Sequence, residues 1–244
     1  LIFYNVSRDL SLDALPSATK IDPLDGFVWV FEGELPFEKN EVITIETELL
    51  RNKDEARNIY SFIDNGASKT LVLGAHYDHL GYGEYGNSLY RGEPAIHNGA
   101  DDNASGTAMI LEISEELQKE KYQELNYLRI AFSAEELGLI GSNYFVDHLP
   151  ISKENILAMI NFDMVGRLKE DRNLGIYGTG TAEQWDDLIE KINTNYSFNI
   201  NKSESGIGAS DHTSFYLEDI PVLHVFTGVH EDYHKPSDDI EKLN

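Results

Sequence analysis

Short apolar runs recur along this chain, and several of them end directly in histidine or carboxylate side chains. The runs predict strands over residues 1–5, 41–48, 58–63, 70–75, 127–133, 156–162, 174–177 and 222–226. Helical patterns come after some of them, over residues 104–119, 137–148 and 182–195. Strands that alternate with helices favour a mainly parallel sheet. We therefore predict an α/β fold, a mainly parallel mixed sheet flanked by helices on both faces.

The charge balance excludes several kinds of partner. The 244 residues include 19 Lys and Arg against 43 Asp and Glu, which gives a net charge of −24. A nucleic-acid-binding protein needs a basic surface, and an anionic membrane repels an acidic chain. No run of 18 apolar residues exists, so no membrane-spanning helix is predicted. We expect neither nucleic-acid binding nor membrane insertion, and the sequence leaves the oligomeric state open.

The chain has no cysteine, which excludes disulfides, thiolate metal sites and a cysteine nucleophile. Any metal site must then use imidazole and carboxylate. Such side chains do come after the predicted strands: His76 after LVLGA, Glu135 and Glu136 after YLRIAFSA, and Asp163 after ILAMINF. In sheets of this kind ligands bind beyond the carboxyl ends of the strands. The sequence thus points these side chains at one edge of the sheet.

Two loops add further candidates to this edge. The segment GADDN carries Asp101 and Asp102 ahead of a predicted helix, and HEDYH after the last strand carries His234. An aspartate before a helix is most often a cap, and a Glu pair at a helix start is often only favourable charge. Asp163 comes after an apolar run, where a carboxylate is costly unless it is paired or bound to metal.

Taken together, these residues match what two metal ions need. Zinc binds imidazole nitrogen and carboxylate oxygen, and a catalytic site leaves room for water. Two ions about 3.5–4 Å apart need a bridging carboxylate and further ligands on each side. Mixed imidazole and carboxylate ligands suit zinc, cobalt or manganese better than magnesium or calcium.

Five motifs in fixed order resemble one known family. The segments AHYDH, GADDNASG, AEELGLIGS, NFDMVG and YHKPSDD are similar to those of the M28 family of co-catalytic zinc aminopeptidases, from Ile59 to Asn244. The resemblance implies a zinc-exopeptidase-like fold and two Zn²⁺ ions per chain, with other divalent transition metals as alternatives. It implies five metal ligands: His76 and Asp163 on one ion, Glu136 and His234 on the other, and Asp101 bridging both.

The resemblance also assigns catalytic and supporting roles. Glu135 matches the general base, and Tyr233 matches one placement of an oxyanion-stabilising tyrosine, with Tyr77 and Tyr216 as rivals. Members of the family tend to have a cis peptide after the bridging aspartate, here Asp101–Asp102. Behind the ligands, the supporting residues would be Asp78, which orients an imidazole, together with Asp102, Ser210 and Asp211.

The function implied is a metal-dependent hydrolase that removes N-terminal amino acids from peptides with a free N-terminus. One alternative is a glutaminyl cyclase-like enzyme with a single zinc. Others are a carboxypeptidase or amidohydrolase of the same family, and a binding module that has lost catalysis. We expect a secreted, periplasmic or cell-envelope location.

Two segments are predicted along the chain. Residues 1–24 would be an N-terminal extension or the remnant of a preceding domain, since LIFYN resembles the end of a protease-associated domain. Residues 25–244 would form the M28-like metallopeptidase domain. The chain begins with Leu1 and stops as a helical pattern begins after Pro236, so we expect a piece of something longer, truncated at the C-terminus.

Overall fold

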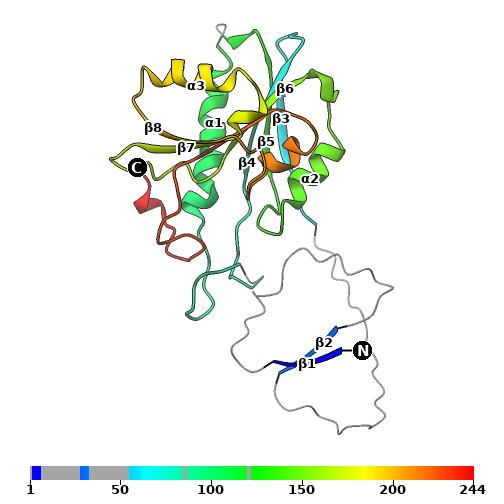
Figure 1. Ribbon diagram of the computed structural model, residues 1–244, viewed down its shortest axis with the longest axis vertical. Coiled ribbons are helices and arrows are strands. Elements are labelled where there is room, and N and C mark those ends of the chain that lie inside the picture. The colour runs from blue at the N-terminus through cyan, green and yellow to red at the C-terminus, as the bar shows by residue number, and fades with distance from the viewer. Residues whose placement is uncertain (1, 7–27, 33–54, 85–86, 120–121) are drawn as a thin grey trace. The chain divides into compact units, whose positions relative to one another are not determined.

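The computed structural model describes residues 2–6, 28–32, 55–84, 87–119 and 122–244. The chain divides into two compact units, Leu1–Asp54 and Glu55–Asn244. In the first unit β1 (Ile2–Val6) and β2 (Val28–Glu32) pair in parallel (Figure 1). The strand expected over 41–48 and the boundary expected after residue 24 fall outside the described residues, so both stay predictions.

The second unit is built on a seven-stranded mixed sheet. Its strands are β3 (Ile59–Ile63), β4 (Thr70–His76), β5 (Asn126–Phe132), β6 (Ile156–Phe162), β7 (Asn173–Tyr177), β8 (Asn199–Ser203) and β9 (Val222–Phe226). They lie in the order β3-β5-β4-β6-β9-β7-β8. The four central strands run parallel, while β3 and β7 are antiparallel to their inner neighbours. The predicted mainly parallel mixed sheet is confirmed.

Helices cover both faces of this sheet (Figure 1). They are α1 (Gly106–Glu116), α2 (Ile140–Asp147), α3 (Trp185–Asn193) and α4 (His212–Tyr216). Short 3₁₀ turns lie at Lys153–Asn155, Thr179–Thr181 and Ile240–Lys242. The sequence did not predict β8, because NINKS has no apolar alternation, nor α4, which has only five residues. None of the helices in the described part of the chain is long and apolar enough to cross a bilayer.

The core reflects the alternation of side chains along the central strands. Val72 and Met159 point to one face of the sheet, where they pack with Phe145 of α2 and Phe215 of α4. Leu73 and Ala158, which are next to these two residues in sequence, point to the other face of the sheet, toward α1 and α3, as does Leu223 of β9. Strands buried on both faces stay fixed in register, because a slip by one residue would exchange the two faces. This rigid sheet holds the loops at its carboxyl edge.

We predict that Phe215→Ala destabilises the fold by about 3–5 kcal/mol, since it leaves a cavity in a packed core. The ring is fully buried and lies edge-on to Phe132 at 6.0 Å. Urea denaturation gives the free energy of unfolding. Leu217→Ala is the control, because Leu217 comes just after the same helix but is 63 % exposed; it should change stability by less than about 0.5 kcal/mol. Equal losses in the two variants would contradict this account of the core.

Candidate active site

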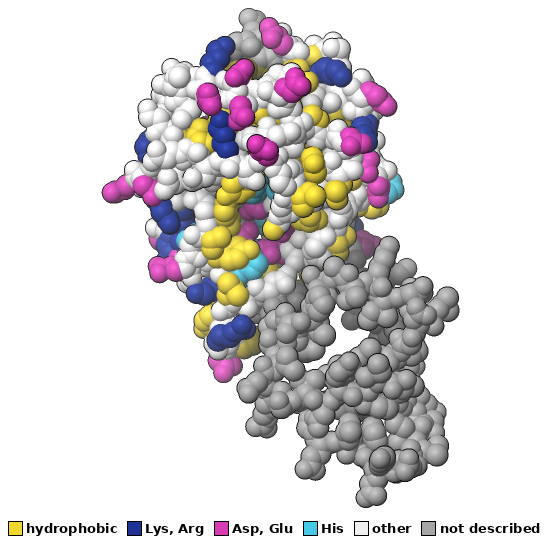
Figure 2. All heavy atoms as spheres, in the orientation of Figure 1, with side chains coloured by type: hydrophobic (Ala, Val, Ile, Leu, Met, Phe, Trp, Pro, Cys, Tyr) yellow, Lys and Arg dark blue, Asp and Glu magenta, His cyan; other side chains and the backbone are white. Residues whose placement is uncertain are grey.

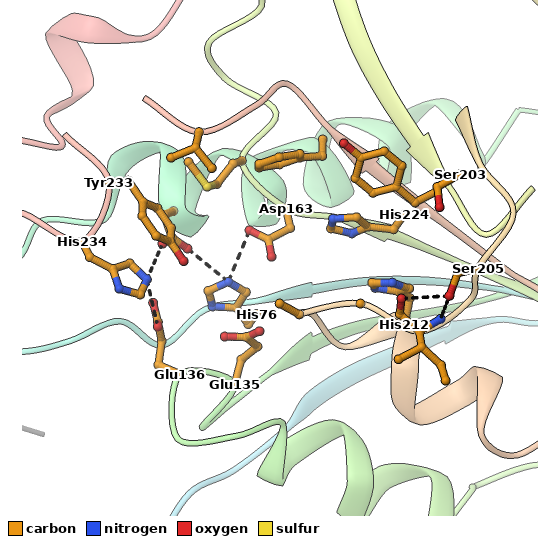
Figure 3. Close-up of a pocket in the computed structure, with 18 residues that line it drawn as sticks. His76, Glu135, Glu136, Asp163, Ser203, Ser205, His212, His224, Tyr233 and His234 are labelled. Atoms are coloured by element: carbon orange, nitrogen blue, oxygen red, sulfur yellow. Dashed lines mark hydrogen bonds and ion pairs between the residues drawn. The ribbon is translucent and has the colours of Figure 1, made fainter. Parts of the chain in front are cut away.

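Histidines and carboxylates converge at the carboxyl edge of the sheet (Figure 3). His76 is the last residue of β4, Asp163 comes directly after β6, and the turn after β5 carries Glu135 and Glu136. The loop after β9 brings in Tyr233 and His234. Figure 2 shows histidine and acidic side chains in a hollow flanked by hydrophobic ones. The clustering at strand ends that the sequence predicted is therefore present.

Asp102 lies at the centre of the cluster, between two imidazoles. Its Oδ1 is 3.3 Å from Nε2 of His76, and its Oδ2 is 3.3 Å from Nε2 of His234. The segment Ala100–Ser105 is a π-helical turn with non-helical dihedral angles at Asp102 and Asn103, joined by a cis peptide bond. One carboxylate thus reaches two histidines from distant parts of the chain, which is the placement that a bridging ligand requires.

The placement expected for Asp101 is therefore wrong, as is the expected position of the cis bond. Asp101 points away from the two histidines: its Oδ1 accepts the N–H of Gly166 at 2.7 Å, and its Oδ2 lies 3.2 Å from Nε2 of His230. The irregular turn reverses the direction of consecutive side chains, so Asp102 faces the cluster instead. The cis peptide comes after Asp102, one residue later than expected.

The neighbouring glutamates are held by Asp78. Its carboxylate accepts the backbone N–H groups of Glu135 at 3.1 Å and Glu136 at 3.3 Å. Nδ1 of His76 lies 3.1 Å from the backbone carbonyl oxygen of Asp78 and 3.8 Å from the carboxylate of Asp78. The Asp78 carboxylate thus fixes the turn that carries the glutamates, and its expected role of orienting an imidazole stays a prediction. Glu136 reaches Nε2 of His234 at 3.3 Å.

Asp163 lies beside His76 and is held from behind by Ser210. The Ser210 hydroxyl donates to Oδ2 of Asp163 at 2.7 Å, while Oδ1 lies 3.5 Å from Nε2 of His76. Within the described residues this Oδ1 is buried and has no hydrogen-bond partner. A buried carboxylate oxygen without a partner is costly unless something else coordinates it.

These residues fit metal ions. Ligand atoms of His76, Glu135 and Asp163 lie within 4.8 Å of one another, as do those of His76, Asp102 and Glu136. Imidazole and carboxylate are the donors that zinc prefers, and the orphaned oxygen of Asp163 supplies a free coordinating atom. His234 presents Nε2 to the cluster because its Nδ1 donates to the carbonyl of Asn87 at 2.8 Å.

The cluster drives the pKa values of its members apart. Burial alone would lower the pKa of His76, yet Asp163 and Asp102 hold that pKa well above its ordinary value. Burial would raise the pKa of Asp102, but hydrogen bonds with His234 and His76 hold it below the usual range. Burial raises the pKa of Glu135 to about 9, with the nearby carboxylates adding to the shift. Carboxyl groups with opposed shifts in one cleft are typical of acid–base sites.

A cavity of about 400 Å³ opens beside the cluster. Its walls include Tyr177, Ile207, Phe226 and Val229, and the Tyr233 ring stacks on His234 at 3.8 Å. Such a mixed apolar and polar cleft has the size and lining of a small-molecule or side-chain site. Of the rival tyrosines, neither Tyr77 nor Tyr216 lines this cavity.

Two histidines that the sequence analysis did not single out also contact residues of the site. His79 pairs through Nδ1 with Glu136 at 2.7 Å, and His230 pairs with Asp101. The second histidine of HYDH, three residues after His76, was the available signal for His79. His212 and His224 stack on each other at 4.4 Å in the cavity wall, and neither is in the metal-ligand groups of the described residues.

The geometry agrees with comparisons to known proteins. The sequence profile of Peptidase family M28 matches residues 58–244. The chain belongs to peptidase family M28. Family membership and the sheet architecture, both expected from the motifs, are therefore confirmed.

Individual members of the family support the same assignment. Leupeptin-inactivating enzyme 1 of Streptomyces exfoliatus is 32 % identical over 72 % of this chain and 36 % of its own length. The LapA aminopeptidase of Legionella pneumophila superposes with a TM-score of 0.62 at 26 % identity, over 77 % of this chain and 49 % of that one. BSAP, a zinc aminopeptidase from Bacillus subtilis, gives 0.59 at 27 %, over 77 % and 45 %. The chain thus spans half or less of the length of these three proteins.

A pH-dependent stability is expected from Asp211, which is fully buried beside the site. Burial raises the pKa of its carboxyl to about 7. An unfolded aspartate has a pKa of about 3.9, so between the two values the folded chain binds more protons, and rising pH destabilises it. Asp211→Asn removes this dependence. Between about pH 5.5 and 7.5, metal-free wild type should lose about 2 kcal/mol more stability than the variant.

Urea unfolding in the presence of a chelator at both pH values measures the difference. Asp211 lies directly before α4. Asp219→Asn is the control, because Asp219 lies just beyond α4 but is exposed to solvent. The stability of this control variant should depend on pH as that of wild type does. If wild type and Asp211→Asn lose the same stability over this range, the buried carboxyl at Asp211 is ionised throughout.

Proposed function

We propose that this chain is a zinc-dependent aminopeptidase, which removes N-terminal amino acids from peptides with a free N-terminus. The observation that carries the proposal is the Asp102 carboxylate between His76 and His234. Each imidazole has a further carboxylate beside it, Asp163 at His76 and Glu136 at His234. Two ligand sets that share one carboxylate favour a two-ion centre over a single ion.

The residues divide into two ligand sets and one base. His76, Asp102 and Asp163 would hold one zinc ion, and His234, Asp102 and Glu136 the other. When bound, the ions supply a water nucleophile at neutral pH and polarise the scissile carbonyl. Both sets are complete without Glu135, which lies beside His76 and Asp163, so Glu135 is left to take the proton of the attacking water and deliver it to the departing amine.

The electrostatics of the cluster support this division. Without cations, burial raises the pKa of Glu135 to about 9, which would keep it protonated and unable to act as a base. A divalent cation beside a carboxyl favours its ionised form. Two of the carboxylates that disfavour ionisation of Glu135, Asp163 and Glu136, are also in the ligand sets that would attract the cations. Metal binding and base activation are thereby coupled.

The walls of the cleft indicate how substrate would bind. The apolar side chains of Ile207, Phe226 and Val229 suit the side chain of an N-terminal residue. Tyr233 lines the same cavity, and its hydroxyl would donate a hydrogen bond to the developing oxyanion. A free α-ammonium group would be attracted by the acidic cluster, which is the contact that restricts cleavage to N-termini.

The relatives support the chemistry, and the alternatives remain distinguishable. BSAP is named as a zinc aminopeptidase and LapA as an aminopeptidase, and the site here has the residues that such chemistry needs. A glutaminyl cyclase-like enzyme would work with one zinc, and a carboxypeptidase or amidohydrolase would not need a free N-terminus. An intact base and both ligand sets disfavour a pure binding module. A secreted or periplasmic location stays a prediction.

The substrate class can be tested by blocking the amino terminus of the substrate. Zinc-loaded protein should release the chromophore from a leucyl anilide but cleave the N-acetyl-leucyl anilide at least about a hundredfold more slowly. Acetylation removes the ammonium charge and replaces it with a bulky neutral group beside buried carboxylates. Spectrophotometry of both substrates gives the rates, with chelator-treated protein as the blank.

Three outcomes would contradict the proposal. Equal cleavage of free and acetylated substrates indicates an endopeptidase or amidohydrolase. Cyclisation of a peptide with N-terminal glutamine, without release of an amino acid, indicates a cyclase. Cleavage from the carboxyl end of a test peptide, seen by mass spectrometry, indicates a carboxypeptidase.

Substitutions can distinguish the proposed roles of the two adjacent glutamates. Glu135→Gln keeps the shape of the side chain but removes the base, so turnover should fall by about 10²–10⁴-fold. Both metal ions should stay bound, since Glu135 is outside the ligand sets. Glu136→Ala should instead weaken the binding of the metal ion at His234. Elemental analysis after dialysis should give two metals per chain for wild type and Glu135→Gln, and fewer for Glu136→Ala.

The reverse pattern is the decisive contradiction. Wild-type turnover in Glu135→Gln would show that another group moves the proton. Full metal occupancy in Glu136→Ala would remove Glu136 from the ligand set, and a limit of one metal in wild type with excess zinc would favour a single-ion enzyme.

A further inference from the structure

We propose that Asp238 is a positioning residue for the metal centre: its carboxylate ties together the three loops that carry Asp102, Asp163 and His234. The inference rests on the proposed function, because its readout is metal affinity. Asp238 is fully buried. It does not line the cavity, and it is not a member of the ligand groups described above. Its contacts therefore need a different explanation from catalysis.

The first contact is with the backbone of the central aspartate. One oxygen, Oδ2 of Asp238, accepts the N–H groups of both Asp101 and Asp102, at 2.9 and 3.0 Å. The backbone carbonyl of Asp238 accepts the N–H of Ala100 at 3.1 Å. These bonds fix the peptide units directly before the side chain that lies between His76 and His234. A shift of this backbone would move both oxygens of the shared carboxylate at once.

The second contact reaches the loop after β6. Nη2 of Arg167 donates to Oδ1 of Asp238 at 2.5 Å, and Nη1 donates to Asp232 at 2.8 Å. Arg167 comes four residues after Asp163. The turn Ala100–Ser105, which carries Asp102, is called the central turn here. The loop after β6 is also fastened to it directly, because the N–H of Gly166 donates to the Asp101 carboxylate at 2.7 Å. The position of Asp163 relative to Asp102 is thus set through Asp238 and Asp101.

The third connection is covalent. Asp238 comes four residues after His234 in a loop with few regular elements, between β9 and the 3₁₀ turn Ile240–Lys242. Within that loop the N–H of Asp238 donates to the carbonyl of Lys235 at 3.1 Å. Anchoring Asp238 against the central turn therefore sets the distance of His234 from Asp102.

The chemistry requires a carboxylate at this position. Both oxygens are occupied, one by two N–H donors and the other by a guanidinium, and all of these partners are donors. An amide offers one acceptor oxygen only, so Asn would turn its NH₂ group toward either the backbone donors or Arg167. Positioning contacts behind metal ligands typically change metal affinity by about 10–100-fold when they are removed.

The test compares metal affinity in Asp238→Asn and in Asp232→Asn. Asp232 is the matched control: it is also buried and also paired with Arg167, but it does not bond to the central turn. Zinc affinities are measured by titration against a competing chelator, and cobalt-loaded protein gives the visible absorption spectrum of the site. We expect Asp238→Asn to weaken at least one ion at least about tenfold and to change the cobalt spectrum. Asp232→Asn should stay within about threefold of wild type.

Two results would overturn the proposal. One is wild-type affinity for both ions in Asp238→Asn. The other is an equal loss in both variants, which would indicate a general loosening of the loop. If Asp238→Asn does not fold, as judged by circular dichroism, the zinc affinity of Arg167→Lys is measured instead. This variant keeps the Asp238 carboxylate but loses the guanidinium that bonds both Asp238 and Asp232. An intermediate loss, about three- to tenfold, then supports the proposal, and wild-type affinity overturns it.

The outcome is distinguishable from failure of the proposed function. A wild-type chain that holds no zinc overturns the proposed function and this inference with it. A wild-type chain that holds two ions, with Asp238→Asn equal to it, overturns the role of Asp238 alone.

Discussion

The arrangement of the site depends on one buried carboxylate that must reach two imidazoles at once. Asp102 lies 3.3 Å from a nitrogen of His76, at the end of β4, and 3.3 Å from one of His234, near the end of the chain. No regular helix or strand would offer both oxygens in this way, and the turn at Ala100–Ser105 is correspondingly irregular. Gly99 begins it with a φ of 61°, where a Cβ would lie 2.6 Å from the carbonyl oxygen of Asp102. A Cβ on Gly106 would lie 2.3 Å from the carbonyl oxygen of Phe162, so the first residue of α1 packs directly against the end of β6.

The concentration of negative charge has a physical consequence for the whole cleft. Asp102, Glu135, Glu136 and Asp163 meet at one edge of the sheet, and imidazoles provide the only nearby side chains that can be cationic among those lining the described cavity. Like charges in a buried place raise the free energy of the ionised state unless cations are present. The cluster is therefore suited to divalent ions by its charge as well as by its donor atoms. The half-buried Arg167, held between Asp232 and Asp238, compensates charge on the other side of the central turn.

Much of the fold could be predicted because the apolar runs are strong. The runs at β6 and β9 have the boundaries expected, since each is continuous and largely buried. The polar strand β8 could not be found, because its pairing with β7 is decided by tertiary contacts and not by its own alternation. In the site, strand ends located His76 and Asp163 correctly, because parallel strands bring the loops at their carboxyl ends to one edge. The choice between Asp101 and Asp102 could not be made this way, because it depends on the dihedral angles of a turn with no standard period.

The two sides of the cleft come from different parts of the structure. The metal-type residues come from the end of β4, the turn Ala100–Ser105, the segments after β5 and β6, and the loop after β9. Tyr177, Ser203 and Ile207 in the cavity wall come from β7, β8 and the segment beyond β8. β7 is antiparallel to β9, so these wall residues reach the cavity from strands outside the parallel centre of the sheet. Substitutions in this wall can therefore change which side chain fits the cavity while the carboxylates and imidazoles across the cleft stay the same. On the proposed function, the preference for an N-terminal residue can thus evolve separately from the hydrolytic step.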